Sequence, residues 1–161
     1  MSSLPGIPDS MNETVTIHHA SIADLEETAR LFNEYRRWYG ADADLDAARS
    51  FLQLRLLGNE AVVFLARDAR KAVGFALLYP TFSSMALQSI WILNDLFIAE
   101  EHRQHGVGTL LLLTATEFAR ESGSCRMELE TAPENRAAQQ LYQRHGWQLC
   151  TELQRWTLMF D

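Results

Sequence analysis

Two glycines, Gly106 and Gly108, lie between a strand-like segment and a long helical pattern, and this junction constrains the fold more than any other feature. Residues 90–98 predict a strand, residues 99–105 are polar, and the apolar periodicity from Gly106 to Arg120 predicts a helix. Glycines let a ligand approach the backbone, and the unpaired amides at a helix start attract anions. The junction therefore predicts a site for a pyrophosphate group, and a turn without a ligand is the alternative.

Two common nucleotide motifs do not fit this turn. A dinucleotide fingerprint needs a third glycine where this chain has Leu111, although Glu130 falls about where that motif places its ribose-binding acid. The polar stretch 99–105 also separates the strand from the glycines, whereas the dinucleotide turn follows its strand directly. A P-loop needs a lysine before its last residue, and Gly108 is followed directly by Thr109.

The rest of the chain predicts an α+β fold, a mixed sheet with helices on both faces. Residues 1–12 are expected to be a flexible leader, and residues 13–161 a single domain. Ser21 and Asp24 form a predicted capping pair for a helix that ends near Tyr39, and Pro80 is expected to end a strand. The predicted strands are 15–18, 61–66, 73–79, 90–98, 127–131, 147–150 and 155–160, and the other predicted helices are 45–57, 106–120 and 135–146.

Charge and composition exclude several classes of protein. The 14 Lys and Arg against 21 Asp and Glu give a net charge of −7, which disfavours nucleic-acid binding and favours a basic substrate. No apolar run approaches the roughly 20 residues of a membrane span, and residues 1–12 lack secretory features, so we expect a cytoplasmic protein with no membrane partner. Cys125 and Cys150, expected to be reduced core thiols, are too few for a metal cage. His102 and His105, with Glu101 beside them, lack a fourth ligand. No metal is therefore expected.

Four ordered segments resemble the GNAT superfamily of N-acetyltransferases: residues 93–98, 103–108, 128–130 and 135–147. Residues 103–108 match the family signature without a gap, and the similarity is nearest to polyamine, thialysine and yeast-type histone or D-amino-acid acetyltransferases. The resemblance implies a mostly antiparallel central sheet of six to seven strands flanked by about four helices. It also implies acetyl transfer from acetyl-CoA to a primary amine of a small molecule, such as a polyamine, an amino acid or a lysine-like compound, by direct attack in a ternary complex. A homodimer is a common state in this family.

The resemblance also assigns residues to the cofactor side. Tyr142 matches a tyrosine that protonates the leaving thiolate in the family, and Asn135 matches a cofactor-contacting asparagine; the alternative is a helix cap and a core tyrosine. Residues implied to line the pantetheine arm are Leu96, Phe97 and Ile98; those implied around the phosphates are Arg103, Gln104, His105, Gly106, Val107, Gly108 and Thr109; Asn135, Ala138 and Tyr142 complete the set.

The acceptor side departs from the polyamine enzymes at Asn94, where they carry a glutamate proposed to deprotonate the amine. Asn94 cannot act as a base, and freeing the lone pair of an amine with a pKa near 10.4 at neutral pH costs about 4 kcal/mol. Strand alternation predicts that Asp95 points away from Asn94, which makes it a weak candidate for the base. Glu128 and Glu130 are other candidates, and an amino-acid α-amine would need little help.

Aromatic residues provide a further hypothesis for the acceptor. Core packing is the ordinary role of aromatic residues such as Trp38, Tyr39, Tyr79 and Trp91. The alternative is an aromatic wall against a cationic acceptor, for which Tyr39 and Tyr79 are the better candidates because a loop follows each. Other functions remain open at this point: a CoA-binding module without catalysis, motivated by Asn94, a protein lysine acetyltransferase, or an interaction protein with a bare glycine turn.

Overall fold

The computed structural model describes residues 14–160, which divide into two compact units that meet in the chain between Leu129 and Glu130. The predicted leader 1–12 lies outside the described residues, and the single-domain organisation stays a prediction. The elements of the first unit are β1 (Thr16–His19), η1 (Ile22–Asp24), α1 (Leu25–Trp38), α2 (Leu45–Leu57), β2 (Val62–Arg67), β3 (Ala72–Ser83), β4 (Gln88–Ile98), η2 (Glu100–His102), α3 (Val107–Glu121) and β5 (Met127–Glu128). The second unit contains α4 (Arg136–Arg144).

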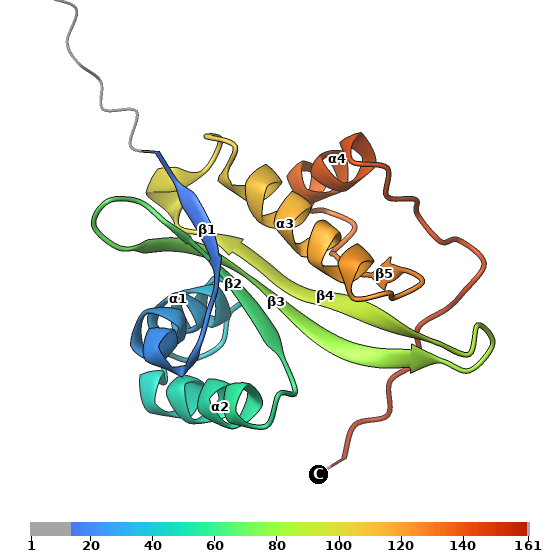
Figure 1. Ribbon diagram of the computed structural model, residues 1–161, viewed down its shortest axis with the longest axis horizontal. Helices are drawn as coiled ribbons and strands as arrows, with labels where there is room; N and C mark the ends of the chain where they lie inside the picture. Colours follow the sequence, from blue (N-terminus) through green and yellow to red (C-terminus); the bar gives the residue numbers. More distant parts are fainter. Residues whose placement is uncertain (1–13, 161) are drawn as a thin grey trace, which may run out of the picture. The chain divides into compact units, whose positions relative to one another are not determined.

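The five strands of the first unit form one sheet in the order β1-β2-β3-β4-β5. Successive strands from β1 to β4 pair antiparallel, and β4 pairs with β5 in parallel. Helices α1 and α2 cover one face of this sheet and α3 covers the other (Figure 1). The mixed α+β architecture is as expected, but the described residues form five strands rather than six to seven. The predicted strands 147–150 and 155–160 carry no strand structure.

Each face of the sheet contributes to a packed core. On the α1 and α2 face, Phe75 and Leu77 of β3 are fully buried together with Leu31 and Leu52 of the two helices. On the α3 face, the fully buried Leu111 belongs to a row of buried residues along the helix. Both faces are therefore apolar where helices cover them, and a buried charge on this sheet needs a specific explanation.

Local signals set the ends of some elements. Ser21 and Asp24 form the predicted capping box, which opens η1 and leads into α1. Pro80 does not end β3, which continues to Ser83 paired with β4. The pairing of β2 with β3 ends at Leu78, so Pro80 lies where β3 has a neighbour on one side only and its missing N–H removes no bond to β2.

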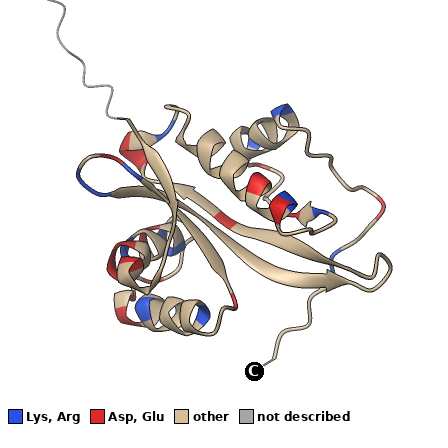
Figure 2. Cartoon of the chain, in the orientation of Figure 1, with Lys and Arg blue, Asp and Glu red and all other residues tan. Residues whose placement is uncertain are grey.

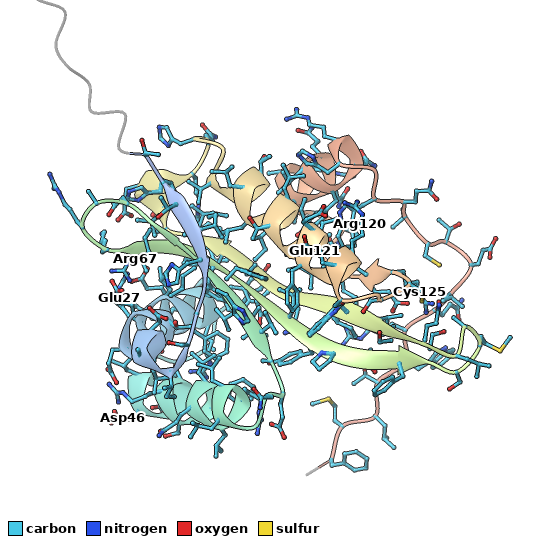
Figure 3. The ribbon with its side chains drawn as sticks, in the orientation of Figure 1. Glu27, Asp46, Arg67, Arg120, Glu121 and Cys125 are labelled. Atoms are coloured by element: carbon cyan, nitrogen blue, oxygen red, sulfur yellow. The ribbon has the colours of Figure 1, made fainter. Side chains whose placement is uncertain are left out.

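Polar contacts fasten α1 to the sheet. Glu27 pairs with Arg67 of β2, as the two labelled side chains in Figure 3 illustrate, and also accepts a hydrogen bond from the amide of Ala72 at 3.1 Å. Both cysteines are exposed free thiols, so the expectation of core thiols was wrong. Cys125 lies beyond the end of α3, where the chain has already left the packed helix.

Candidate functional site

A β-bulge places Asn94 outside the regular ladder of β4. Asp95 pairs with Leu77 and Leu93 pairs with the next residue, Leu78, so Asn94 has no partner of its own on β3. The exposed Asn94 side chain donates a hydrogen bond from Nδ2 to Oδ2 of Asp95 at 3.0 Å. The expectation that alternation separates these two side chains was wrong, because the extra residue interrupts the alternation.

Asp95 is a buried carboxylate, with 6% of its surface exposed, in the middle of the sheet. It is the acidic residue of β4, visible as the red segment on that strand in Figure 2. Burial raises the pKa of Asp95, and hydrogen bonds from the Tyr35 hydroxyl and the Asn94 amide act in the opposite direction. The pKa of the half-buried Tyr79 is also raised, by burial first and then by the negative charge of Asp95.

Of the residues predicted for the acceptor side, Asn94 and Tyr79 lie near Asp95, and Tyr39 packs on Tyr35, whose hydroxyl bonds to Asp95. Asn94 contacts Asp95 directly, Tyr79 lies within reach of its charge, and the 60% exposed Tyr39 packs at 5.0 Å on the ring of Tyr35. A negative charge edged by tyrosine rings is an environment that attracts an ammonium group.

The two tryptophans of the predicted aromatic wall lie elsewhere. Trp91 donates from Nε1 to Ser122 Oγ at 2.9 Å and packs on Phe118, which places it on the α3 face. Trp38 is stacked under the guanidinium of Arg103.

The sequence analysis did not assign Tyr35 to the acceptor side. The available signal was its spacing from Tyr39, because residues four apart on a helix lie on one face.

The end of β4 offers a free backbone edge. Leu96, Phe97 and Ile98 pair with β3 on one side, while β5 reaches only Trp91 and Ile92 on the other. Within the first unit, the outer edge of residues 96–98 has no strand partner. Apart from the Ile98 carbonyl, which accepts a hydrogen bond from Arg103, the outward backbone groups of this edge are available to an extended ligand. The Phe97 side chain is core, since it packs on the rings of Tyr35 and Phe75.

The glycine turn after β4 has the backbone geometry that the sequence required. Gln104 and Gly106 have φ of 63° and 82°, and Gly106 is the N-cap of α3 with no side chain capping the helix. The first bond of the helix runs from the Leu110 amide to the Gly106 carbonyl at 3.1 Å, so the amides of residues 107–109 lie ahead of it. A Cβ on Gly106 would meet nothing within 4 Å, which leaves open space beside these amides. The turn fits a phosphate group.

The Arg103 side chain links the glycine turn to two other elements. Its Nε donates to the carbonyl of Ile98 at 2.9 Å, and its guanidinium lies 4.2 Å from the ring centroid of Trp38 and 5.6 Å from that of Phe97. The start of the turn is thereby fixed to the end of α1 and the end of β4. The phosphate role predicted for this residue stays a prediction.

Two further contacts fix η2, which precedes the glycine turn. His102 Nε2 lies 3.1 Å from Asp68 Oδ2, and Lys71 Nζ donates to Glu101 Oε1 at 2.9 Å. The predicted residue His105 is exposed. Residues 14–160 hold no group of three or more side chains suited to a metal ion.

The second unit carries the remaining predicted residues. Asn135 is the N-cap of α4, and its side chain accepts a hydrogen bond from the Ala138 amide at 3.2 Å. The ring of the partly buried Tyr142 lies 5.9 Å from that of Trp147. Asn135 thus performs the capping role that was one of its two interpretations. Its contact with a cofactor and the acid role of Tyr142 stay predictions.

The other candidate bases are both paired with arginines. Glu128 accepts from Arg126 Nε at 2.8 Å in the first unit, and Glu130 pairs with Arg155 in the second. Each of these two carboxylates therefore already has an arginine partner.

A strand edge without a strand partner, followed by a glycine turn whose helix has no side-chain cap, is an arrangement suited to an extended ligand that ends in a phosphate. The model of the Acetyltransferase (GNAT) family matches residues 25–147, and this chain belongs to that family. An uncharacterized N-acetyltransferase of Bacillus subtilis is 39% identical over 134 residues, which are 83% of this chain and 90% of the relative. A thialysine N-epsilon-acetyltransferase of Bos taurus is 30% identical over 84 residues, 52% of this chain and 49% of that protein.

The fold of the family is also found among solved structures. The crystal structure of a probable acetyltransferase superposes with a TM-score of 0.85 at 37% identity, covering 91% of this chain and 98% of the other. The protein is therefore an acetyltransferase of the GNAT type. None of the helices in residues 14–160 combines the length and apolarity needed to span a membrane.

Proposed function

We propose that this protein transfers an acetyl group from acetyl-CoA to the primary amine of a small molecule, by direct attack in a ternary complex. The observation that carries the proposal is the succession of Asn94, the free edge at residues 96–98 and the uncapped turn at Gly106 within one segment of β4 and α3. In this proposal, Asn94 binds the amine at one end of the strand edge and the glycine turn binds the pyrophosphate at the other. We further propose that the enzyme works in the cytoplasm, where acetyl-CoA is available, and that it is a homodimer.

The donor side of the site holds the ligand by its backbone. The pantetheine arm extends along residues 96–98, and the pyrophosphate meets the amides of residues 107–109, where the positive end of the α3 dipole adds to the attraction. Acetyl-CoA supplies an acetyl thioester whose carbonyl carbon the amine attacks. Backbone amides near Leu96 stabilise negative charge on the carbonyl oxygen, and Tyr142 gives its proton to the departing thiolate.

The acceptor enters as an ammonium ion and must lose a proton before it attacks. Asn94 commits Nδ2 to Asp95, which leaves its carbonyl oxygen to accept a hydrogen bond from the ammonium. The charge of Asp95 lies directly behind that contact and favours a cation there. A C–N bond then forms, the C–S bond breaks, and the net products are an N-acetylated amine, free thiol and one proton. No covalent intermediate on the enzyme is required.

The direct test is thiol release from acetyl-CoA at pH 7 and pH 9 with polyamines, L- and D-amino acids, lysine analogues and lysine peptides. The mass of the product must rise by one acetyl group. Acetyl-CoA that raises the melting temperature without thiol release from any amine would instead define a CoA-binding module. Release only with peptides would make the enzyme a protein lysine acetyltransferase. The absence of both a thermal shift and thiol release would refute the proposal.

A further inference from the structure

The side chain of Tyr35 is held in place by aromatic rings from three elements. Phe32 lies on the same helix with its ring centroid 6.1 Å away, and Phe75 of β3 and Phe97 of β4 meet the Tyr35 ring edge-on at 5.8 Å and 6.0 Å. Tyr39, which follows α1, packs on it at 5.0 Å. Neighbouring rings packed in this way restrict both side-chain torsion angles of a tyrosine. The position of the Tyr35 hydroxyl relative to β4 is thereby fixed.

That hydroxyl donates a hydrogen bond to the carboxylate of Asp95. Asp95 is buried, with 6% of its surface exposed, and Asn94 Nδ2 donates to its Oδ2 at 3.0 Å. An ionised carboxylate only accepts hydrogen bonds, and a buried one needs donors to offset the loss of water. Tyr35 and Asn94 supply these donors from two different elements, α1 and β4, and so determine how the carboxylate is oriented.

Two further ionisable groups lie near Asp95. Burial raises the pKa of Tyr79 on β3, the negative charge of Asp95 raises it further, and the Arg55 guanidinium of α2 acts in the opposite direction. The interactions that favour the charged form of Asp95 itself are the hydrogen bonds from Tyr35 and Asn94. The Tyr35 hydroxyl is therefore one of two groups that keep this buried carboxylate ionised.

The orientation of the Asn94 amide depends on this arrangement. Because Asp95 accepts from Nδ2, the amide turns its nitrogen to Asp95 and leaves its oxygen for another donor. Without the Tyr35 hydroxyl, the carboxylate takes up a proton more readily, and a protonated carboxyl also donates, so it no longer selects one orientation of the amide. An amide that presents its N–H groups to an ammonium ion repels it.

We propose that Tyr35 is a positioning residue for the acceptor: its hydroxyl holds the Asp95 carboxylate so that Asn94 presents its oxygen to the ammonium group. The inference rests on the proposed function and deepens it, because it adds to the acceptor site a residue of α1 that acts through Asp95 and Asn94. Tyr35 itself contacts neither the amine nor acetyl-CoA in this proposal.

The test replaces Tyr35 by phenylalanine, which keeps the ring and removes only the hydroxyl. Thiol release from acetyl-CoA is followed between pH 5 and pH 8.5 with two probes, 1,5-diaminopentane and Nα-acetyl-L-lysine. The primary amines of both probes resemble that of a lysine side chain and stay charged in this range. Tyr35→Phe should raise KM for both probes about tenfold at pH 7, with kcat and the Kd for acetyl-CoA nearly unchanged.

The same variant should move the pH profile in one direction. A hydrogen bond to the charged form of a carboxylate lowers its pKa, so loss of the Tyr35 hydroxyl raises the pKa of Asp95 further above its usual value. Asp95 then loses its charge at a higher pH. The fall of kcat/KM toward acid pH should therefore begin about one pH unit higher than in the unmodified enzyme. A purely structural loss lowers kcat/KM without moving this limb.

Thr28→Val is the matched control, because Thr28 is a fully buried residue of the same helix whose hydroxyl donates to the Asp24 carbonyl at 2.8 Å. The variant loses a buried hydroxyl of α1 and should keep the KM values and the pH profile of the unmodified enzyme. The double variant Tyr35→Phe with Asp95→Asn tests the route of the effect. Since Tyr35 acts through Asp95, its loss should change KM little once the carboxylate is absent.

The two proposals fail in distinguishable ways. An unshifted pH profile in Tyr35→Phe would overturn the positioning role and leave acetyl transfer intact. Equal losses from Tyr35→Phe with and without Asp95→Asn would also overturn it, since additive effects show that Tyr35 does not act through Asp95. Turnover of other amines with neither probe accepted would remove the alkylammonium site on which the inference depends. Absence of thiol release with every amine, together with no stabilisation by acetyl-CoA, refutes the proposed function and the inference with it.

Discussion

Gly106→Ala is expected to weaken acetyl-CoA binding by more than its effect on stability explains. Gly106 has a φ of 82° and open space where a Cβ would be built. The new methyl group therefore clashes with nothing in the protein, and the stability cost is that of an L-residue in the left-handed region, about 1–2 kcal/mol. For a chain of this size, each kcal/mol corresponds to a fall in melting temperature of about 2–4 °C.

Gly123→Ala supplies a control with the same backbone cost. Gly123 has a φ of 77°, also with nothing within 4 Å of a built Cβ, but it follows the opposite end of α3. Both variants should lose about the same stability in differential scanning calorimetry. Only Gly106→Ala places a methyl group beside the anion-binding amides, and the loss of one charge-assisted hydrogen bond there should raise the Kd for acetyl-CoA about tenfold or more.

Isothermal titration at 25 °C, well below either melting transition, separates the two effects. Equal Kd values for the two glycine variants would refute the assignment of the turn as the phosphate site. A larger stability loss at Gly106 than at Gly123 would refute the statement that the space beside Gly106 is open.

Three further variants test other parts of the site. Asp95→Asn should lower kcat/KM for amines while leaving the Kd for acetyl-CoA unchanged. Because burial raises the pKa of Asp95 in the folded state, its charge reduces stability as pH rises above the usual value near 3.9, so Asp95→Asn should match or exceed the parent's melting temperature at pH 7 and lose that advantage near pH 4. Tyr142→Phe should reduce kcat with little change in acetyl-CoA affinity, and unchanged turnover would remove Tyr142 from its acid role. Arg103→Lys keeps the charge but loses the stack on Trp38, and should destabilise the fold by about 1 kcal/mol in urea unfolding.

The sequence predicted the elements whose signals are local. The capping box at Ser21 and the glycine turn at Gly106 depend on nearby residues, and both form as expected. The continuation of β3 through Pro80 could not be predicted, because it depends on where β2 ends on the other side of the sheet. The apolar alternation at residues 155–160 predicted a strand that the structure lacks, since alternation alone does not supply a pairing partner.

Parts of the candidate site needed tertiary information. The bulge at Asn94 results from the register between β3 and β4, and no residue type in β4 predicts it. The buried state of Asp95 follows from that register and from the position of Tyr35 above it.

The contacts of Arg103 with Trp38 and with the Ile98 carbonyl couple the acceptor side of the proposed site to its acetyl-CoA side. The Arg103 guanidinium joins the last turn of α1, which the acceptor-side tyrosine Tyr39 follows directly, to the loop that presents the proposed phosphate-binding amides. A ligand that immobilises the loop also restrains the end of α1, so part of the entropy lost on acceptor binding has already been lost. Thermodynamic reciprocity then requires the acceptor to tighten acetyl-CoA by the same factor. Substrate synergy of this kind would vanish in Arg103→Lys even where each substrate still binds alone.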